Sequence, residues 1–111
     1  MAYDEHLADR IRALLATDHD VVEKKMFGGL AFLIGGNMSV SASGQGGMLL
    51  RCDPAETDVL VREEHVEAFV MRGKAMDGWL RIDPDGVQTD DDLRRWVGLG
   101  VGYARSLPAK S

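Results

Sequence analysis

The amino-acid sequence predicts an α+β fold in two layers, an antiparallel β-sheet of about five to six strands with flanking helices. The first observation is a short apolar run, Leu30 to Ile34, which is long enough for a buried strand and too short for a typical helix. The second is the distribution of glycine, since seven of the 13 glycines lie between Gly28 and Gly47, as in a meander of tight turns. The third is amphipathic helical periodicity near both ends of the chain.

The apolar run lies between two glycine pairs with different predicted roles. Gly35-Gly36-Asn37 follows the run and tolerates positive φ, which predicts a tight hairpin turn. Gly28-Gly29 precedes the run and predicts a bulge or a point of close backbone approach. We therefore interpret the run as the central strand, and we expect three of its residues on one face: Leu30, Phe32 and Ile34.

The chain before this strand predicts one helix and one strand. Asp4 is suited to the N-cap of a helix that ends near Thr17. The apolar residues of this helix recur at helical spacing and form one stripe: Leu7, Ile11, Leu14 and Leu15. Val21 to Met26 then begins with β-branched residues and becomes polar toward its end, so we expect a partly exposed strand.

Two further strands are predicted after the central one. Met38 to Ser43 alternates apolar residues with serines, which predicts a strand with one buried and one solvent-facing side. Gly44 to Gly47 turns the chain, and Met48 to Cys52 has the apolar character of another strand.

The second half of the chain predicts a helix, two strands and a final helix. Asp53-Pro54-Ala55-Glu56 combines an N-cap aspartate, a proline at the first helical position and a glutamate three residues after the cap. Val66 to Met71 and Gly78 to Ile82 have strand composition, and Thr89 is suited to cap the last helix. The predicted order of elements is therefore α-β-β-β-β-α-β-β-α.

Three glycines interrupt the last predicted helix and need an explanation, because each costs about 1 kcal/mol relative to alanine. They are Gly98, Gly100 and Gly102. We favour close packing of this helix on the sheet, and the alternative is a partner helix that docks on the glycines.

Length and charge restrict the class of protein. A chain of 111 residues can bury its own core, so we expect one domain over residues 1–111. Its 13 Lys and Arg are outnumbered by 18 Asp and Glu, and the net charge of −5 argues against non-specific nucleic-acid binding. No apolar run is long enough to cross a membrane, and the acidic start of the chain differs from a secretory signal. Together with the single Cys52, these features predict a cytoplasmic protein.

The candidate catalytic and metal-binding residues form no recognisable pattern. Asp83-Pro84-Asp85-Gly86 fits a β-turn better than a calcium loop, because no glutamate follows at the twelfth position. Cys52 precedes an aspartate, which raises the pKa of a thiol, so we expect a structural role. The three histidines share no metal-ligand spacing with one another or with the cysteine: His6, His19 and His65. We therefore expect no catalytic residue, no metal and no cofactor.

One stretch is more distinctive than the others, a basic pair followed by Met-Phe-Gly-Gly: Lys24, Lys25, Met26, Phe27, Gly28 and Gly29. With the Gly-Asn-Met hairpin, the Asp-Pro-Ala-Glu-Thr helix start and the late Met-Asp-Gly-Trp-Leu, it resembles the N-terminal domain of the TfoX/Sxy competence-regulator family over about residues 8–106. The resemblance implies a two-layer α+β fold and a role near transcriptional control of DNA uptake in bacteria. It brings no catalytic residues. The regulators also carry a C-terminal helical domain, which the 111 residues do not contain.

Two hypotheses on function follow. The first is a small non-enzymatic regulatory or adaptor domain that binds a protein partner through its sheet and the corner from Lys24 to Gly29. The second is a small-molecule-binding protein or an unrecognised enzyme that uses a pocket near Met26 to Gly29. Neither hypothesis involves a membrane or direct, non-specific contact with nucleic acid, and the sequence leaves open whether the chain forms a homodimer.

Overall fold

A computed structural model describes residues 3–16, 21–26 and 28–108, and the order of its elements confirms the prediction. The N-terminal half contains α1 (Glu5–Leu14), β1 (Val21–Met26), β2 (Gly29–Ile34), β3 (Asn37–Ala42) and β4 (Met48–Arg51). The second half contains the 3₁₀ turn η1 (Pro54–Glu56), α2 (Thr57–Leu60), β5 (Val66–Met71), β6 (Lys74–Ile82), the 3₁₀ turn η2 (Pro84–Val87) and α3 (Asp90–Ser106).

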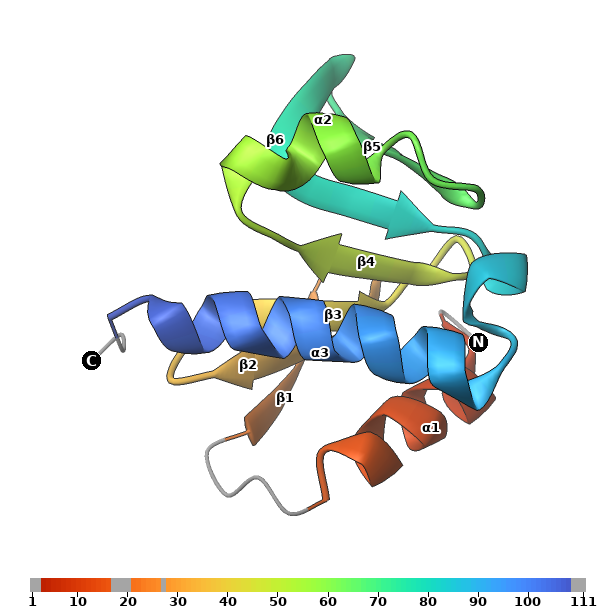
Figure 1. Ribbon diagram of the computed structural model, residues 1–111. Helices are drawn as coiled ribbons and strands as arrows, with labels where there is room; N and C mark the ends of the chain where they lie inside the picture. The colour runs from red at the N-terminus through yellow and green to blue at the C-terminus, as the bar shows by residue number, and fades with distance from the viewer. Residues whose placement is uncertain (1–2, 17–20, 27, 109–111) are drawn as a thin grey trace.

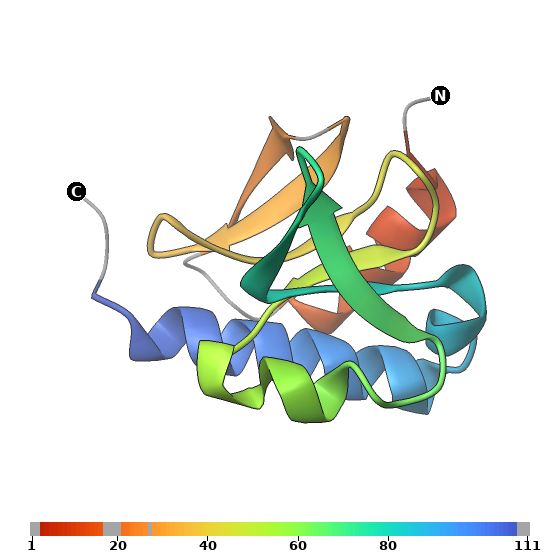
Figure 2. The same ribbon diagram turned by 90° about the horizontal axis from the view of Figure 1, so that it is seen from above.

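The strands form one antiparallel sheet in the order β1-β2-β3-β4-β6-β5, so β1 and β5 are its edges. The helices pack on one side of this sheet, and α3 runs along its middle over β3 and β4 (Figure 1). The view from above shows no helix of the described chain on the other side (Figure 2). We call the two sides the helix-covered face and the open face.

The main core lies between the helices and the helix-covered face. Phe32, Leu50 and Leu80 contribute fully buried side chains from three strands, and α1 and α3 contribute Ile11 and Trp96. The prediction for the central strand is confirmed in that Leu30 and Phe32 belong to this core and Ile34 is buried. Alternation along β2 sends the intervening residues to the open face.

The two glycine pairs form a tight turn and a close backbone approach, as the sequence predicts. Gly35 and Gly36 have φ of 57° and 83° and form the two-residue turn between Ile34 and Asn37, as predicted. Gly28 (φ 75°) lies in the β1–β2 turn. Gly29 is the close approach, because a Cβ there would lie 2.1 Å from the carbonyl oxygen of Ala42. Neither glycine forms a bulge.

The bulge lies instead in β3. This strand also differs from the prediction, because it has no solvent-facing side. Phe32 pairs with Val40 and Leu33 pairs with Met38, so Ser39 is an extra residue. Its hydroxyl donates a 2.8 Å hydrogen bond to the carbonyl of Phe32. Every residue of β3 is buried, serines included, because this strand is central in the sheet. The bulge also places Met38 on the open face while Val40 packs in the main core.

Capping confirms the predicted helix starts. The side chain of Asp4 accepts hydrogen bonds from the first turn of α1, Asp53 does so for η1, and Thr89 does so for α3. Several bounds differ from the prediction, by one residue in β3 and β4 and by more in two other elements. The helix α1 ends at Leu14 rather than near residue 17, which lies outside the described residues, and β6 begins at Lys74 rather than at Gly78.

Close packing explains one of the three helix glycines. A Cβ at Gly100 would lie 2.6 Å from the carbonyl oxygen of Ser39 and 2.8 Å from Leu50, so α3 approaches the sheet at this point. Gly98 and Gly102 have no atom within 4 Å of such a Cβ and face open space. The packing interpretation therefore holds for Gly100 and does not account for the other two.

Candidate functional site

The open face carries an apolar cluster of its own. Ala31, Met38 and Leu49 are at most 4% exposed although no described helix covers them. Longer side chains of the same face cover them and stay partly exposed themselves: Met26, Leu33, Phe69 and Trp79. The rings of Phe69 and Trp79 lie 6.4 Å apart at a tilt of 48°. A second apolar layer therefore faces outward on the side away from the helices.

One hollow in this layer, of about 380 Å³, contains part of the predicted site. It lies across β1, β2, β3, β4 and β6, and we call it the Arg51 hollow; its lining is Lys24, Met26, Leu33, Gly36, Met38, Arg51 and Trp79. The apolar side chains of this lining, which we call its floor, are those of Met26, Leu33, Met38 and Trp79, and the two charged residues among the described lining are both basic. Such a lining suits a ligand that combines apolar and negatively charged groups.

Arg51 is held between two aromatic rings. Its guanidinium carbon lies 5.5 Å from the ring centre of Trp79, its cross-strand neighbour on β6, and 5.6 Å from that of Tyr103 on α3. These distances are typical of cation–π contacts. Among the described residues, no carboxylate lies within ion-pair distance of Arg51. The rings therefore orient a half-buried cation without neutralising it.

The two predicted lysines do not act on the same face. Lys24 lies on the open face with Met26, whereas Lys25 alternates to the side of Glu23. Glu23 points toward the helices, since its carboxylate accepts hydrogen bonds of 2.6 and 2.8 Å from Arg12 of α1. This contact lowers the pKa of Glu23. The structure thus joins Lys24 and Met26 to the hollow and separates Lys25 from it.

The remaining residues of the predicted corner have other positions. Gly28 shapes the hairpin turn and Gly29 lets β2 approach β3, and neither glycine lines the hollow. Phe27 lies outside the described residues. The residues that sequence reasoning missed are Arg51, Trp79, Leu33 and Met38. They come from four different strands, and no local motif connects them.

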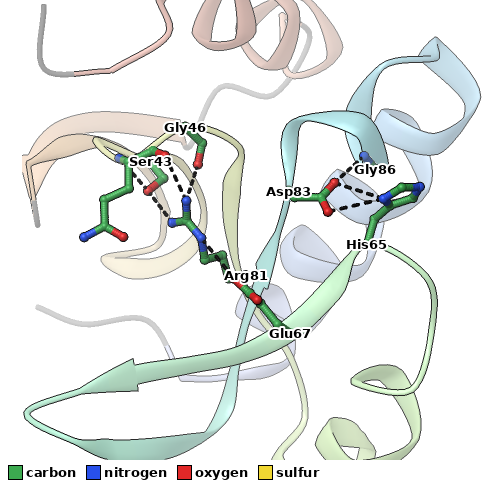
Figure 3. A network of polar contacts seen from close by, with 8 residues as sticks. Ser43, Gly46, His65, Glu67, Arg81, Asp83 and Gly86 are labelled. Carbon is green, nitrogen blue, oxygen red and sulfur yellow. Dashed lines mark hydrogen bonds and ion pairs between the residues drawn. The ribbon is translucent and has the colours of Figure 1, made fainter.

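A second hollow on the open face, of about 590 Å³, has a different polar lining. We call it the Arg81 hollow; its lining includes Ser43, Leu49, Glu67, Phe69, Arg72 and Arg81. The Arg81 guanidinium donates to the Ser43 hydroxyl at 3.0 Å and to the carbonyls of Gln45 and Gly46 at 2.9 Å (Figure 3). It also pairs with Glu67 at 3.4 Å. Arg81 is therefore occupied in holding the β3–β4 loop against β6.

His65, Asp83 and Asp85 form a cluster that the sequence did not predict. Their ligand-type atoms lie within 4.8 Å of one another, a spacing that could hold a metal ion. His65 has a left-handed backbone (φ 70°) where the chain enters β5, and its Nδ1 lies 3.2 Å from a carboxylate oxygen of Asp83 (Figure 3). This contact raises the pKa of His65.

Asp83 has a structural task in the same place. Its carboxylate accepts a 3.0 Å hydrogen bond from the Gly86 N–H in the turn η2, and its own N–H donates to the carbonyl of His65 at 2.9 Å. The cluster thus fastens the start of β5 to the end of β6. These contacts explain the geometry without an ion.

Cys52 has the structural character predicted for it. The thiol is 2% exposed, its sulfur lies 3.9 Å from the Thr57 hydroxyl oxygen, and burial raises its pKa. The Thr57 hydroxyl also accepts a 2.8 Å hydrogen bond from the Gly78 N–H, so the thiol lies in a packed junction between η1, α2 and β6. A buried thiol with a raised pKa is a poor nucleophile.

The architecture defines the class of the protein, an α+β domain in which one face of the sheet lies under helices and the other is open with an apolar, locally basic surface. Within this class the chain belongs to the TfoX N-terminal domain family, whose match covers residues 13–104. Searches of the curated proteins and of the solved structures found no match. No helix in the described part of the chain has the length and apolar character needed to cross a membrane.

Proposed function

We propose that the chain is a small, non-enzymatic regulatory or adaptor domain of the cytoplasm that acts through protein–protein interaction. Residues 1–111 serve as one TfoX N-terminal-like domain, and the open face of the sheet is its binding surface. The observation that carries the proposal is the second apolar layer, in which Met26, Leu33, Phe69 and Trp79 remain partly exposed. Aromatic residues and methionine are enriched at the centres of protein interfaces.

The chemistry of the hollow favours binding over catalysis. Its lining contains apolar side chains and two cations, Lys24 and Arg51, and among the described residues it has no carboxylate, histidine or thiol beside them. General acid–base catalysis and nucleophilic catalysis need such groups within hydrogen-bond reach of each other. The resemblance to competence regulators supports a regulatory process as the setting.

Affinity capture from cells that encode this chain, followed by mass spectrometry, tests the proposal. We expect the wild type to retain a protein that the Leu33→Glu variant loses, because the new carboxylate lies on the apolar surface. Val59→Glu is the matched control, since Val59 on α2 is 67% exposed and lies on the helix side. The melting temperature of Val59→Glu should stay close to that of the wild type, and Leu33→Glu should still unfold in one cooperative transition, with a loss of stability no smaller than that of Leu33→Ala.

Two outcomes would count against the proposal. If the wild type and Leu33→Glu retained the same proteins, the open face would not be the binding surface. If sedimentation showed a wild-type dimer that Leu33→Glu dissociates, and no other protein were captured, the face would belong to a second copy of the chain. A small molecule that co-purifies with the wild type and not with Leu33→Glu would favour the alternative function, ligand binding near Met26.

A further inference from the structure

We propose that the Arg51 hollow binds an acidic and apolar segment of a partner protein, with a glutamate or aspartate side chain at Arg51 and an aliphatic or aromatic side chain on the methionine and leucine floor. The proposal rests on the proposed function and adds the chemistry of the partner. It follows from the state of Arg51, from the charge of the hollow and from the apolar character of its floor.

Arg51 differs from most other arginines of the chain in its contacts. Across the described residues several arginines pair with carboxylates: Arg10, Arg12, Arg81, Arg94 and Arg95. Within the described part of the chain, the Arg51 guanidinium contacts the rings of Trp79 and Tyr103 and pairs with no carboxylate, although the chain has more acidic than basic residues. A half-buried guanidinium whose N–H groups lack an internal acceptor is satisfied by solvent or by a ligand.

The geometry of Arg51 selects the kind of anion. A guanidinium held by rings keeps its planar fork in one orientation, and this fork matches the two oxygens of a carboxylate. The two rings come from different layers, Trp79 from the sheet and Tyr103 from α3, so the orientation depends on the whole fold. Less conformational entropy is therefore lost when an acidic side chain binds.

The charge of the hollow is opposite to that of the whole chain. The chain carries a net charge of −5, yet both charged residues of the hollow, Lys24 and Arg51, are cations. Lys24 is exposed on the edge strand β1, and like Arg51 it has no carboxylate partner among the described residues. A local basic site attracts acidic segments and repels basic ones.

The floor of the hollow distinguishes a protein segment from nucleic acid. Met26, Leu33 and Met38 provide flexible apolar contacts, which adapt to aliphatic or aromatic side chains. Binding of single-stranded nucleic acid needs a row of cations along the backbone and free aromatic faces for stacking. Here Arg51 already contacts the ring of Trp79, and Lys24 is the one further cation among the described residues that line the hollow.

Peptide display tests the proposal even while the partner is unidentified. A phage library of random dodecapeptides is selected on the immobilised wild-type protein after depletion on the Arg51→Gln variant. We expect the enriched sequences to place glutamate or aspartate next to leucine, isoleucine, phenylalanine or tryptophan. Enrichment of basic or uncharged sequences, or no enrichment at all, would overturn the proposal.

Fluorescence anisotropy with the best enriched peptide then assigns the contact. Arg51→Gln should weaken binding about tenfold or more, the range expected for loss of a hydrogen-bonded ion pair. A peptide with glutamine in place of the acidic residue should bind the wild type more weakly than the original peptide by a similar factor. The two peptides should bind Arg51→Gln with nearly the same affinity. Arg62→Gln is the matched control, because Arg62 is exposed in the turn after α2 and does not line the hollow.

Further variants and probes separate the remaining outcomes. If Arg51→Gln fails to fold, Lys24→Gln on the exposed edge strand replaces it and should weaken binding several-fold, and an unchanged affinity would overturn the proposal. If fluorescent oligothymidylate binds as tightly as the peptide and competes with it, the hollow is a nucleic-acid site and the proposal fails. A last outcome separates this inference from the proposed function. If Leu33→Glu loses a captured partner that both Arg51→Gln and Lys24→Gln retain, the open face binds protein through apolar contacts. The proposed function then stands and this inference fails.

Discussion

The two faces of the sheet bury similar kinds of side chain by different means. On the helix-covered face, Phe32 and Leu50 are 0% exposed beneath α1 and α3, and Gly100 lets the helix backbone approach the strands. On the open face, the described residues that cover Met38 and Leu49 are long neighbours of the same layer. The helix-covered face is therefore buried under the backbone of packed helices, whereas the cover of the open face consists of side chains from the sheet itself.

The charged groups of the sheet also differ in whether they have a partner within the fold. Glu23 and Arg12 pair across the helix-covered side, and Arg81 is saturated by loop carbonyls and Glu67 on one part of the open face. Arg51 on the other part has two rings and no internal carboxylate among the described residues. The charged groups of Glu23, Arg12 and Arg81 are therefore paired within the fold, whereas the region around Arg51 can pair with a ligand.

The largest expected effect comes from the core of the helix-covered face. Phe32→Ala removes a fully buried ring beneath the helices, so the free energy of unfolding should fall by about 3–5 kcal/mol. Leu33→Ala, the next residue, removes a partly exposed side chain from the open face and should cost less than half as much. Urea denaturation of both variants measures the difference, and equal losses would contradict the distinction between the faces.

Glycine substitutions at the β1–β2 turn should come next. Gly29→Val places a Cβ against the backbone of Ala42, so β2 and β3 must separate. The free energy of unfolding should fall by well over about 1 kcal/mol. Gly28→Val has space but a φ of 75°, so its cost should be about 1–2 kcal/mol.

Gly28→Asn separates the two causes, since asparagine tolerates left-handed backbone and should recover much of the loss in melting temperature. Gly29→Asn should recover none. If Gly28→Val and Gly29→Val both melted like the wild type, the geometric roles of these glycines would be wrong.

The two arginines of the open face should differ in stability. Arg81→Gln breaks three hydrogen bonds and an ion pair and should cost about 1–3 kcal/mol of unfolding free energy. Arg51→Gln loses two cation–π contacts and should cost about 1 kcal/mol or less. Thermal denaturation under matched conditions compares the two, and a larger loss for Arg51→Gln would show that Arg51 is primarily structural.

His65 should give the protein a modest pH dependence. The hydrogen bond to Asp83, assisted by the nearby charges of Asp83, Glu64 and Asp85, raises the pKa of His65 above its ordinary value near 6.5. Protonated His65 therefore stabilises the folded state. This contribution is complete below the unfolded pKa near 6.5 and is lost as the pH rises through the higher folded pKa.

The His65→Gln variant tests this sign. The melting temperature of the wild type should exceed that of the variant more at pH 6 than at pH 8. NMR titration of the imidazole should show the raised pKa directly, and Asp83→Asn should lower it. A difference that grows toward alkaline pH would contradict the assignment.

The smallest effects on stability should come from the exposed lysines of β1. Lys24→Glu with Lys25→Glu should change the free energy of unfolding by less than about 0.5 kcal/mol while weakening capture of the partner. The single variants distinguish the two lysines, because Lys24 lies on the open face and Lys25 does not. Lys25→Glu alone should retain the partner, and loss of binding by Lys25→Glu but not by Lys24→Glu would move the binding surface to the other side of the sheet.

Much of the fold was predictable because its signals are local. Strand-length apolar runs, the positive φ that Gly35 and Gly36 tolerate, and the side-chain caps Asp4, Asp53 and Thr89 each depend on a few neighbouring residues. The prediction for β3 was wrong because its serines lie in a central strand with a bulge, where neighbouring strands rather than residue type decide burial.

The candidate site was predictable only in part. The order of the elements and the resemblance to the TfoX N-terminal domain family could be inferred from the residues alone, which also singled out Lys24 and Met26. The folded chain was needed to show that Lys25 lies on the other side and that Arg51, Trp79 and Tyr103 meet. Capping and turn preferences act over a few residues, whereas a hollow on a sheet is lined by residues that strand pairing and helix packing bring together from distant parts of the chain.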